Sequence, residues 1–350
     1  MKWHRLIIAM IVGVGLLGSA MVLPAIAQLR GEVPGSFLIF PEFAITPPAV
    51  TQLRISDVQD PALGGTTRVH LQYICPGIGS VCATLDRHKF LTFHGTLIIN
   101  VATDLGGPFP AAPCDNGYVI AFVENAAHVP ISANQLIGSY RISAPGGVDD
   151  AEAVNAIAVQ SAQLPGTELG TIDATGELVL RFGLAASDDY VALPHTLHSD
   201  FQAVNTLAVP PKLTQLIVLT PTIRSGLPNP TAHLAIRWWN QFEDEFSTTR
   251  SFVCWAKVDL EDISGLFTAA TLGSPYGSLR VGVVTVGGYS PAILGVIRET
   301  GPGPTLRRMY HTGLQSSIYG PDPTTTTPPT EPPPPPEPPP PGGAPGNTPS

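Results

Sequence analysis

Residues 68–101 have the sequence RVHLQYICPGIGSVCATLDRHKFLTFHGTLIINV, with two strand-like runs on either side of a short loop. In the first run, 68–74, apolar and polar residues alternate with the two-residue period of a strand that buries one face. The second run, 96–101, is rich in β-branched residues. Cys75 and Cys82 flank a turn of proline, glycine and serine. We therefore expect the two runs to pair as a β-hairpin whose tip a disulfide can close.

Runs of the same kind recur along the chain, and turn residues separate nearly all of them. They cover residues 37–40, 51–56, 68–74, 96–101, 118–123, 136–142, 177–182, 213–220, 232–239, 251–258, 278–286 and 292–297. Such a series of short strands predicts an all-β fold, an antiparallel β-sandwich built as one large or two consecutive sandwiches. Residues 150–160 fit a helix or a strand.

The chain divides into five segments by composition. We expect a signal peptide at 1–27, an N-terminal β-sandwich region at 28–145, an irregular connecting region at 146–211, a C-terminal β region at 212–320 and a proline-rich disordered tail at 321–350. The tail holds 15 of the 38 prolines, a density that favours an extended polyproline II spacer over a packed core.

The N-terminal segment has the layout of a secretory signal. Lys2 and Arg5 precede an apolar run that ends at Ala25-Ile26-Ala27, so cleavage after Ala27 is expected. An uncleaved membrane anchor is the alternative, because the run is close to spanning length. We expect a secreted protein, extracellular, at the cell surface or periplasmic, with no transmembrane segment after cleavage.

Charge narrows the range of partners. Without the expected signal peptide, 16 basic residues face 27 acidic ones. An acidic chain repels nucleic acid and anionic lipid over most of its surface. The partners we expect are a cell-envelope component, a glycan or another protein, and nucleic acid is not among them.

The four cysteines are Cys75, Cys82, Cys114 and Cys254. An even number in an exported chain favours two disulfides. Three pairings are open from the sequence. Because they flank one turn, Cys75 and Cys82 are the preferred pair, which leaves Cys114 with Cys254.

Motifs for catalysis are weak in this sequence. The nearest approach to a nucleophile elbow is residues 288–292, GYSPA, which lacks the final glycine and has proline after Ser290. That proline removes the backbone N–H that an oxyanion hole would use. We expect no catalytic residue and no cofactor, although a site assembled from distant loops would leave no local motif.

Histidines and carboxylates gather first in Asp86-Arg87-His88, with His70 and His94 nearby in the sequence. Paired strands could bring them together, and imidazole with carboxylate suits zinc or a general base. The simpler interpretation is an Asp86–Arg87 ion pair with histidines on a wetted sheet face. We favour that interpretation and predict no metal, and we keep His88 and Asp86 as candidate ligand contacts.

A second group is His195 and His198 with Asp200, preceded by Asp188 and Asp189. On a helix the two histidines would share a face, but the composition predicts a loop, where the spacing carries little meaning.

Aromatic residues suggest a binding surface. Trp238 and Trp239 are adjacent, so on a strand they face opposite sides and only one can lie in the core. The other is a candidate ligand contact for a sugar or an interface, unless residues 242–246 cover it. Trp255, beside Cys254, is expected to pack against a disulfide. The acidic residues 243–245 are expected to form a solvated hairpin tip.

Several segments together resemble a group of uncharacterised secreted bacterial proteins: FLIFPEF, TRVHLQYICPG, DRHKFLTFHGTLIINV, GYVIAFVEN, PISANQLIGSYRI and FVCWAKVDL. The resemblance implies export and an all-β body, and it brings no activity. The expected signal peptide, strands, disulfides and proline-rich tail, with no catalytic motif in the sequence, favour a non-catalytic structural or adhesive protein. A secreted hydrolase and a carbohydrate-binding module are the alternatives.

Overall fold

The computed structural model describes residues 33–46, 50–59, 65–76, 82–106, 115–143, 153–172, 178–209, 211–221, 229–286, 291–300, 305–308, 310–315 and 317–319. In these ranges the strands form five sheets with antiparallel ladders, apart from one short parallel pair. The predicted all-β class with antiparallel sheets is confirmed. The expected signal peptide 1–27 and tail 321–350 lie outside the described residues. No helix in the described ranges is long and apolar enough to cross a membrane.

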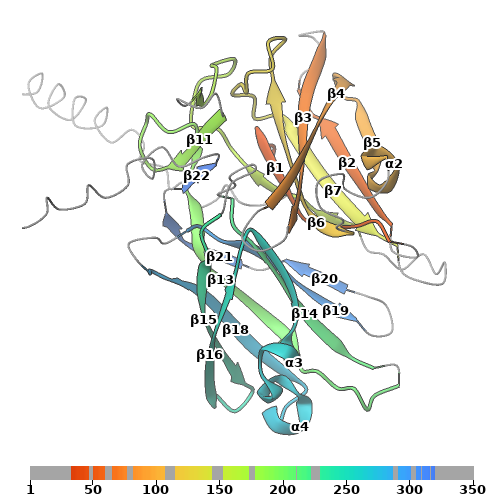
Figure 1. Ribbon diagram of the computed structural model, residues 1–350, viewed down its shortest axis with the longest axis vertical. Helices are drawn as coiled ribbons and strands as arrows, with labels where there is room; N and C mark the ends of the chain where they lie inside the picture. Colours follow the sequence, from red (N-terminus) through yellow and green to blue (C-terminus); the bar gives the residue numbers. More distant parts are fainter. Residues whose placement is uncertain are drawn as a thin grey trace, which may run out of the picture.

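The first half of the chain forms two sheets that face each other across a hydrophobic core (Figure 1). Its elements are β1 (Phe37–Ala44), β2 (Thr51–Asp57), β3 (Thr66–Pro76), β4 (Cys82–Thr92), β5 (Thr96–Asn100), α2 (Val101–Leu105), β6 (Asn116–Glu124), β7 (Leu136–Ile142), β8 (Val154–Asn155) and β9 (Ile157–Val159). The sheet orders are β4-β3-β6-β1-β9 and β5-β2-β7-β8. Inward residues of β2 and β3, such as Leu53 and Leu71, fill the core between them.

The second half repeats this plan with two further sheets, ordered β16-β15-β18-β13-β21 and β17-β14-β19-β20. Its elements are β13 (Leu193–Gln202), β14 (Leu213–Leu219), β15 (Ala232–Asn240), β16 (Glu245–Phe252), β17 (Trp255–Asp259), α3 (Leu260–Ile263), η3 (Gly265–Phe267), α4 (Ala269–Leu272), β18 (Tyr276–Val284), β19 (Leu294–Thr300), β20 (Thr305–Arg308) and β21 (Tyr310–Gln315). A second core lies between these sheets, and the short helices contribute Leu260 and Phe267 to it.

A fifth, smaller sheet contains β10 (Thr171–Ile172), β11 (Leu178–Gly183), β12 (Tyr190–Val191) and β22 (Ser317–Tyr319). Strand β11 pairs in parallel with β12 and antiparallel with β22. Because β22 comes from the end of the described chain, this sheet brings together segments far apart in the sequence.

A third core joins the two halves. Strands β1 and β6 are buried on both faces. On the outer face of their sheet, Phe37 and Ile39 pack in one cluster with Ile217 and Leu219 of β14. The predicted arrangement of one large or two consecutive sandwiches is therefore wrong. The five sheets share three cores, and the core between the halves makes them one packed unit. The physical reason is the continuous apolar sequence of β1 and β6, which requires cover on both faces.

The predicted hairpin between 68–74 and 96–101 is also wrong in its partner. Strand β3 pairs along its whole length with β4, whereas β5 pairs with β2 in the facing sheet. Strand β4 is the edge of its sheet. Its Asp86 is exposed, whereas Arg87 and Lys89 are half-buried and contact Asp104, and inward-pointing charges are usual on an edge strand. That polarity hid β4 from a search for apolar alternation.

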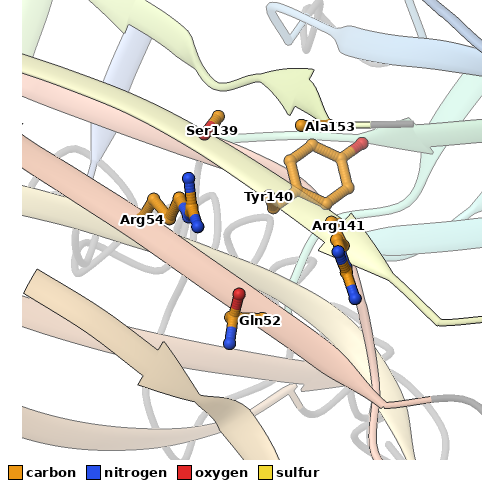
Figure 2. A pocket seen from close by; sticks show the side chains of 6 residues that line it. All are labelled: Gln52, Arg54, Ser139, Tyr140, Arg141 and Ala153. Carbon is orange, nitrogen blue, oxygen red and sulfur yellow. The ribbon is translucent and has the colours of Figure 1, made fainter. Parts of the chain in front are cut away.

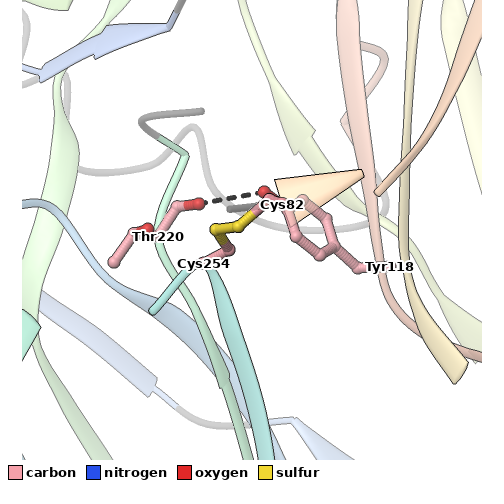
Figure 3. Close-up of a disulfide and its surroundings, with 4 residues drawn as sticks. All are labelled: Cys82, Tyr118, Thr220 and Cys254. Atoms are coloured by element: carbon pink, nitrogen blue, oxygen red, sulfur yellow. Dashed lines mark hydrogen bonds between the residues drawn. A yellow bond between two sulfur atoms is a disulfide. The ribbon is translucent and has the colours of Figure 1, made fainter. Parts of the chain in front are cut away.

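One disulfide connects the halves (Figure 3). Cys82, at the start of β4, bonds Cys254, just before β17, with their Cα atoms 6.6 Å apart. Beside it, the Tyr118 hydroxyl donates to the carbonyl of Thr220 at 3.0 Å. The disulfide therefore lies in the inter-half core, where both cysteines are buried.

The predicted pairs Cys75–Cys82 and Cys114–Cys254 are wrong. Cys75 lies opposite Ala83 in the β3–β4 ladder, one position away from Cys82. Successive residues of a strand face opposite sides, so Cys75 points into the first core and Cys82 into the inter-half core. Cys75 is also in a disulfide, and Cys114 lies outside the described residues.

The span 146–211, expected to be irregular, contains β13, which was not among the predicted strands. This ten-residue strand pairs with β18 on one side and β21 on the other. Both neighbours come from later in the chain, so the strand is stabilised by pairing that its own sequence does not reveal.

Candidate functional site

A group of polar side chains lies at the rim of the inter-half core, on the outer face of the β4-β3-β6-β1-β9 sheet. In β3, Val69 and Leu71 point into the first core, so His70 between them points to the outer face. The His70 ring stacks on Phe122 with centroids 4.7 Å apart and planes at 22°. Because Phe122 belongs to the inter-half core, the group begins where that core ends.

Strand register brings His70, His88 and Glu124 together. His70 lies opposite His88 on β4 and opposite Phe122 on β6, two residues before Glu124. His88 Nδ1 is 2.9 Å from Glu124 Oε1, and His70 Nδ1 is 3.4 Å from Glu124 Oε2. Nitrogen and oxygen atoms suited to binding a metal, one from each residue, all lie within 4.8 Å of one another.

His128 joins this group from the turn after β6. Its Nδ1 lies 3.0 Å from Glu124 Oε1 and 3.2 Å from His88 Nδ1. The residue has φ = 63°, a left-handed conformation that is uncommon outside glycine and is several-fold enriched in histidine and asparagine. The Asn125 side chain accepts two backbone N–H groups of the turn and so fixes its shape. We call His70, His88, Glu124 and His128 the histidine–glutamate cluster.

Asp86 orients the His70 ring. Its Oδ1 lies 2.8 Å from His70 Nε2 and accepts from the Gln72 amide at 3.0 Å. Burial raises the pKa of Asp86, but the hydrogen bond and charge of His70 and the Gln72 hydrogen bond outweigh it, and the pKa lies below its ordinary value. Asp86 therefore stays ionised and accepts a hydrogen bond from the Nε2–H of His70. The other ring nitrogen of His70, Nδ1, is directed at Glu124.

Glu124 is the buried member of the cluster. Its side chain is 0% exposed, and Arg68 Nε lies 3.8 Å from its Oε1. The Arg68 guanidinium also lies over the Phe90 ring, 4.9 Å from the centroid. Within the described chain, Glu124 Oε2 makes no hydrogen bond. Burying a carboxylate oxygen without a hydrogen bond costs folding free energy. Glu124 Oε2 therefore destabilises the fold unless a further partner binds it.

Asp86, His88 and His70 do converge, which is the alternative that the sequence left open and not the interpretation it favoured. His94 lies in the turn between β4 and β5, with φ = 54°. Arg87 does not form the expected ion pair with the Asp86 carboxylate. Its guanidinium donates instead to the backbone carbonyls of Asp104 and Asp86.

Sequence reasoning missed Glu124 and His128. One signal was available for Glu124, because it ends the otherwise apolar run of β6, where a carboxylate within a doubly buried strand needs partners. His128 had no such signal, since only the fold places its turn over β4.

The second group of histidines and aspartates, from which no site was predicted, does not converge. His195 and His198 lie on β13, not in a loop, and a spacing of three on a strand puts them on opposite faces. Burial and then the charge of Arg280 lower the pKa of His198. Asp188 and Asp189 accept backbone N–H groups of nearby turns and strands.

As predicted, only one of the two adjacent tryptophans lies in the core. Trp238 is fully buried between Phe246 and Phe267, with centroids at 5.7 and 4.0 Å, while Trp239 is half-buried on the other face. Phe246 therefore covers the inward tryptophan and not the outward one. Trp255 is 6% exposed beside Cys254, as expected for packing at a disulfide.

A pocket of about 140 Å³ lies on the outer face of the β5-β2-β7-β8 sheet (Figure 2). Its lining residues are Gln52, Arg54, Ser139, Tyr140, Arg141 and Ala153. Gln52 lies opposite Arg141 on the neighbouring strand, and Arg54 lies opposite Ser139. Guanidinium and amide donors suit a polar or anionic group. The sequence did not indicate this pocket, which is on a different sheet from the histidine–glutamate cluster.

Comparison with known proteins adds little to this geometry. No protein-family model matches the chain, and no curated protein matches it significantly. Among solved structures, the chain is similar to the infectious bursal disease virus VP2 subviral particle at 10% identity, with 82% of this chain and 72% of that chain covered and a TM-score of 0.16. A TM-score of this size does not indicate a shared fold.

Proposed function

We propose that the chain is an exported, non-catalytic structural or adhesive protein of the cell surface or periplasm. The observation that carries this proposal is the fusion of the two halves into one body by the inter-half core and the Cys82–Cys254 disulfide. A disulfide between distant segments suits an oxidising compartment, and the described chain has no free cysteine.

Polar contacts across the same interface support a rigid body. Glu42, fully buried on β1, binds both Lys257 on β17 and Arg298 on β19, the latter at 3.0 Å. The Trp255 indole N–H donates to the carbonyl of Pro41 at 2.8 Å. Hydrophobic, ionic and covalent contacts therefore act together against movement between the halves, a property that suits a structural module.

Cell fractionation with thiol labelling tests the proposal. The protein should appear in the envelope or medium, and a maleimide reagent should react with it only after reduction. A cytoplasmic protein that labels without reductant would contradict the proposal.

A secreted hydrolase is the second candidate function, favoured by one observation. His88 lies 2.9 Å from the buried Glu124 carboxylate, within the reach that a catalytic base and its partner need. Screening the purified chain against ester, peptide and glycoside substrates tests this candidate. Activity that Glu124→Gln abolishes while the far-UV CD spectrum is kept would establish it and would overturn the non-catalytic proposal.

A further inference from the structure

We propose that the histidine–glutamate cluster, His70, His88, His128 and Glu124, binds one divalent transition-metal ion of the zinc class. This inference goes beyond the structural role proposed above and does not depend on it. Imidazole and carboxylate groups are the ligands that Zn²⁺ takes in proteins.

The distances within the cluster suit a shared ion. Glu124 Oε1, His88 Nδ1 and His128 Nδ1 form a triangle with sides of 2.9, 3.0 and 3.2 Å. In a tetrahedral zinc site with bonds of about 2.0 to 2.1 Å, ligand atoms lie about 3.3 to 3.4 Å apart. The three atoms therefore need to separate by only a few tenths of an ångström to surround an ion.

His70 is the remaining candidate ligand, since its Nδ1 is 3.4 Å from Glu124 Oε2 and it forms with His88 and Glu124 a set of ligand atoms within 4.8 Å of one another. Asp86 holds the other ring nitrogen at 2.8 Å. A carboxylate that accepts the second N–H of a ligating histidine is the usual outer-shell partner in zinc sites, because it fixes the tautomer and the ring direction.

The cluster without an ion leaves two polar groups poorly matched. The Nδ1 atoms of His88 and His128 face each other at 3.2 Å, and only one neutral tautomer of the pair can donate to the other. Glu124 Oε2 is buried and, in the described part of the chain, makes no hydrogen bond. A divalent cation satisfies both, since it accepts lone pairs from the imidazoles and neutralises the carboxylate.

Arg68 is the group that opposes the ion. Its guanidinium carries the positive charge nearest to Glu124 Oε1 in the described chain, at 3.8 Å, and its NH2 nitrogen lies 3.5 Å from His128 Nε2. The Phe90 ring, over which the guanidinium lies, can hold Arg68 when the ion neutralises Glu124 in its place. Arg68→Gln should therefore tighten metal binding.

Titration calorimetry of the purified, chelator-stripped chain with Zn²⁺ tests the proposal. We expect one saturable site per chain, and Co²⁺ in its place should give visible absorption typical of a four-coordinate ion. His88→Ala should weaken binding more than Asp86→Asn does, and Asp86→Asn should lose about 10- to 100-fold in affinity because it only orients a ligand.

A surface ligand keeps the test independent of folding. His128→Asn preserves the left-handed backbone while removing an imidazole, so the fold should survive and affinity should fall. The matched control is His233→Ala, which removes a histidine that pairs with Ser251 on strands of the other half and should leave affinity unchanged. Zn²⁺ should raise the Tm of the unaltered chain, and EDTA should reverse the rise.

The outcomes are distinct. No saturable Zn²⁺ binding by the unaltered chain would overturn the proposal and would leave the cluster as a network of hydrogen bonds around Arg68 and Glu124. Binding that His233→Ala removes and His128→Asn and His88→Ala leave intact would also overturn it.

Discussion

At the scale of single residues, side-chain size is restricted wherever one strand crosses close to another. Gly117, at the start of β6, leaves no room for a larger residue. A Cβ added there would lie 2.1 Å from the Ile74 carbonyl oxygen and 2.9 Å from the Phe43 ring. Since the nearest atom belongs to the backbone, it cannot move aside as a flexible side chain would.

We predict that Gly117→Ala destabilises the chain by about 1 to 3 kcal/mol through overpacking. Urea unfolding followed by tryptophan fluorescence measures the change. Gly265→Ala is the matched control, because a Cβ there meets nothing within 4 Å, and it should change stability by less than about 0.5 kcal/mol. Equal losses in the two variants would contradict the steric argument.

Two buried tyrosines make the unfolding free energy depend on alkaline pH. Burial and the charge of Asp104, to which its hydroxyl donates at 2.8 Å, raise the pKa of Tyr73 above the ordinary 10.0. Burial and then the charge of Asp189 raise the pKa of Tyr190 in the same way. Above pH 10 the unfolded chain therefore releases phenol protons that the folded chain keeps.

Stability should accordingly be retained below pH 10 and fall above it, by about 1.4 kcal/mol per pH unit for each tyrosine. Tyr73→Phe and Tyr190→Phe should each reduce this slope by one proton, and the double variant by two. Denaturant unfolding between pH 9 and 11 measures the slopes. Identical slopes in all four proteins would exclude the tyrosines as its source.

At the scale of elements, the short helix α2 depends on its cap. Asn100 Oδ1 accepts from the Thr103 backbone N–H at 3.2 Å. The helix in turn places Asp104 against Tyr73 and Lys89 on the first large sheet. A five-residue helix has too few internal hydrogen bonds to stand alone, so the cap and these contacts hold it.

We predict that Asn100→Ala costs about 1 kcal/mol, the usual value of an N-cap. Asn100→Ser should restore most of the loss, because serine caps equally well. Thermal unfolding of the three proteins measures the effect. If Asn100→Ser loses as much as Asn100→Ala, the contribution of Asn100 is not capping.

At the scale of the whole molecule, the Cys82–Cys254 disulfide closes a long loop, with 172 residues of sequence separation. Such a cross-link restricts the unfolded chain strongly. We predict that Cys82→Ala/Cys254→Ala lowers the unfolding free energy by about 4 to 5 kcal/mol. Denaturant unfolding under non-reducing conditions measures the loss, and an unchanged midpoint would show that the inter-half core alone sets the stability.

Much of the secondary structure could be predicted from the sequence. Strand β7 was predicted at its observed bounds, 136–142, and β2, β14 and β15 nearly so. These strands alternate or are continuously apolar, which is a local signal. Strands β4 and β13 were missed because β4 is a charged edge strand and β13 contains proline, two histidines and an aspartate.

The candidate site was predicted only in part. His70 and His88 could be associated because they lie on neighbouring strands close in sequence. Glu124 and His128 follow 36 and 40 residues after His88, and nothing in the intervening sequence indicates that β6 returns beside β3. Their convergence depends on which strand pairs with which.

By itself, the sequence determined where most strands lie and which side chains share a face, because the two-residue period is set by the backbone of each strand alone. Only the tertiary structure decided that β3 pairs with β4 and β6, that Cys82 bonds Cys254, and that three histidines contact Glu124. The reason is physical: strand partners and disulfides depend on which buried faces meet in space, and local alternation of apolar residues does not encode that choice.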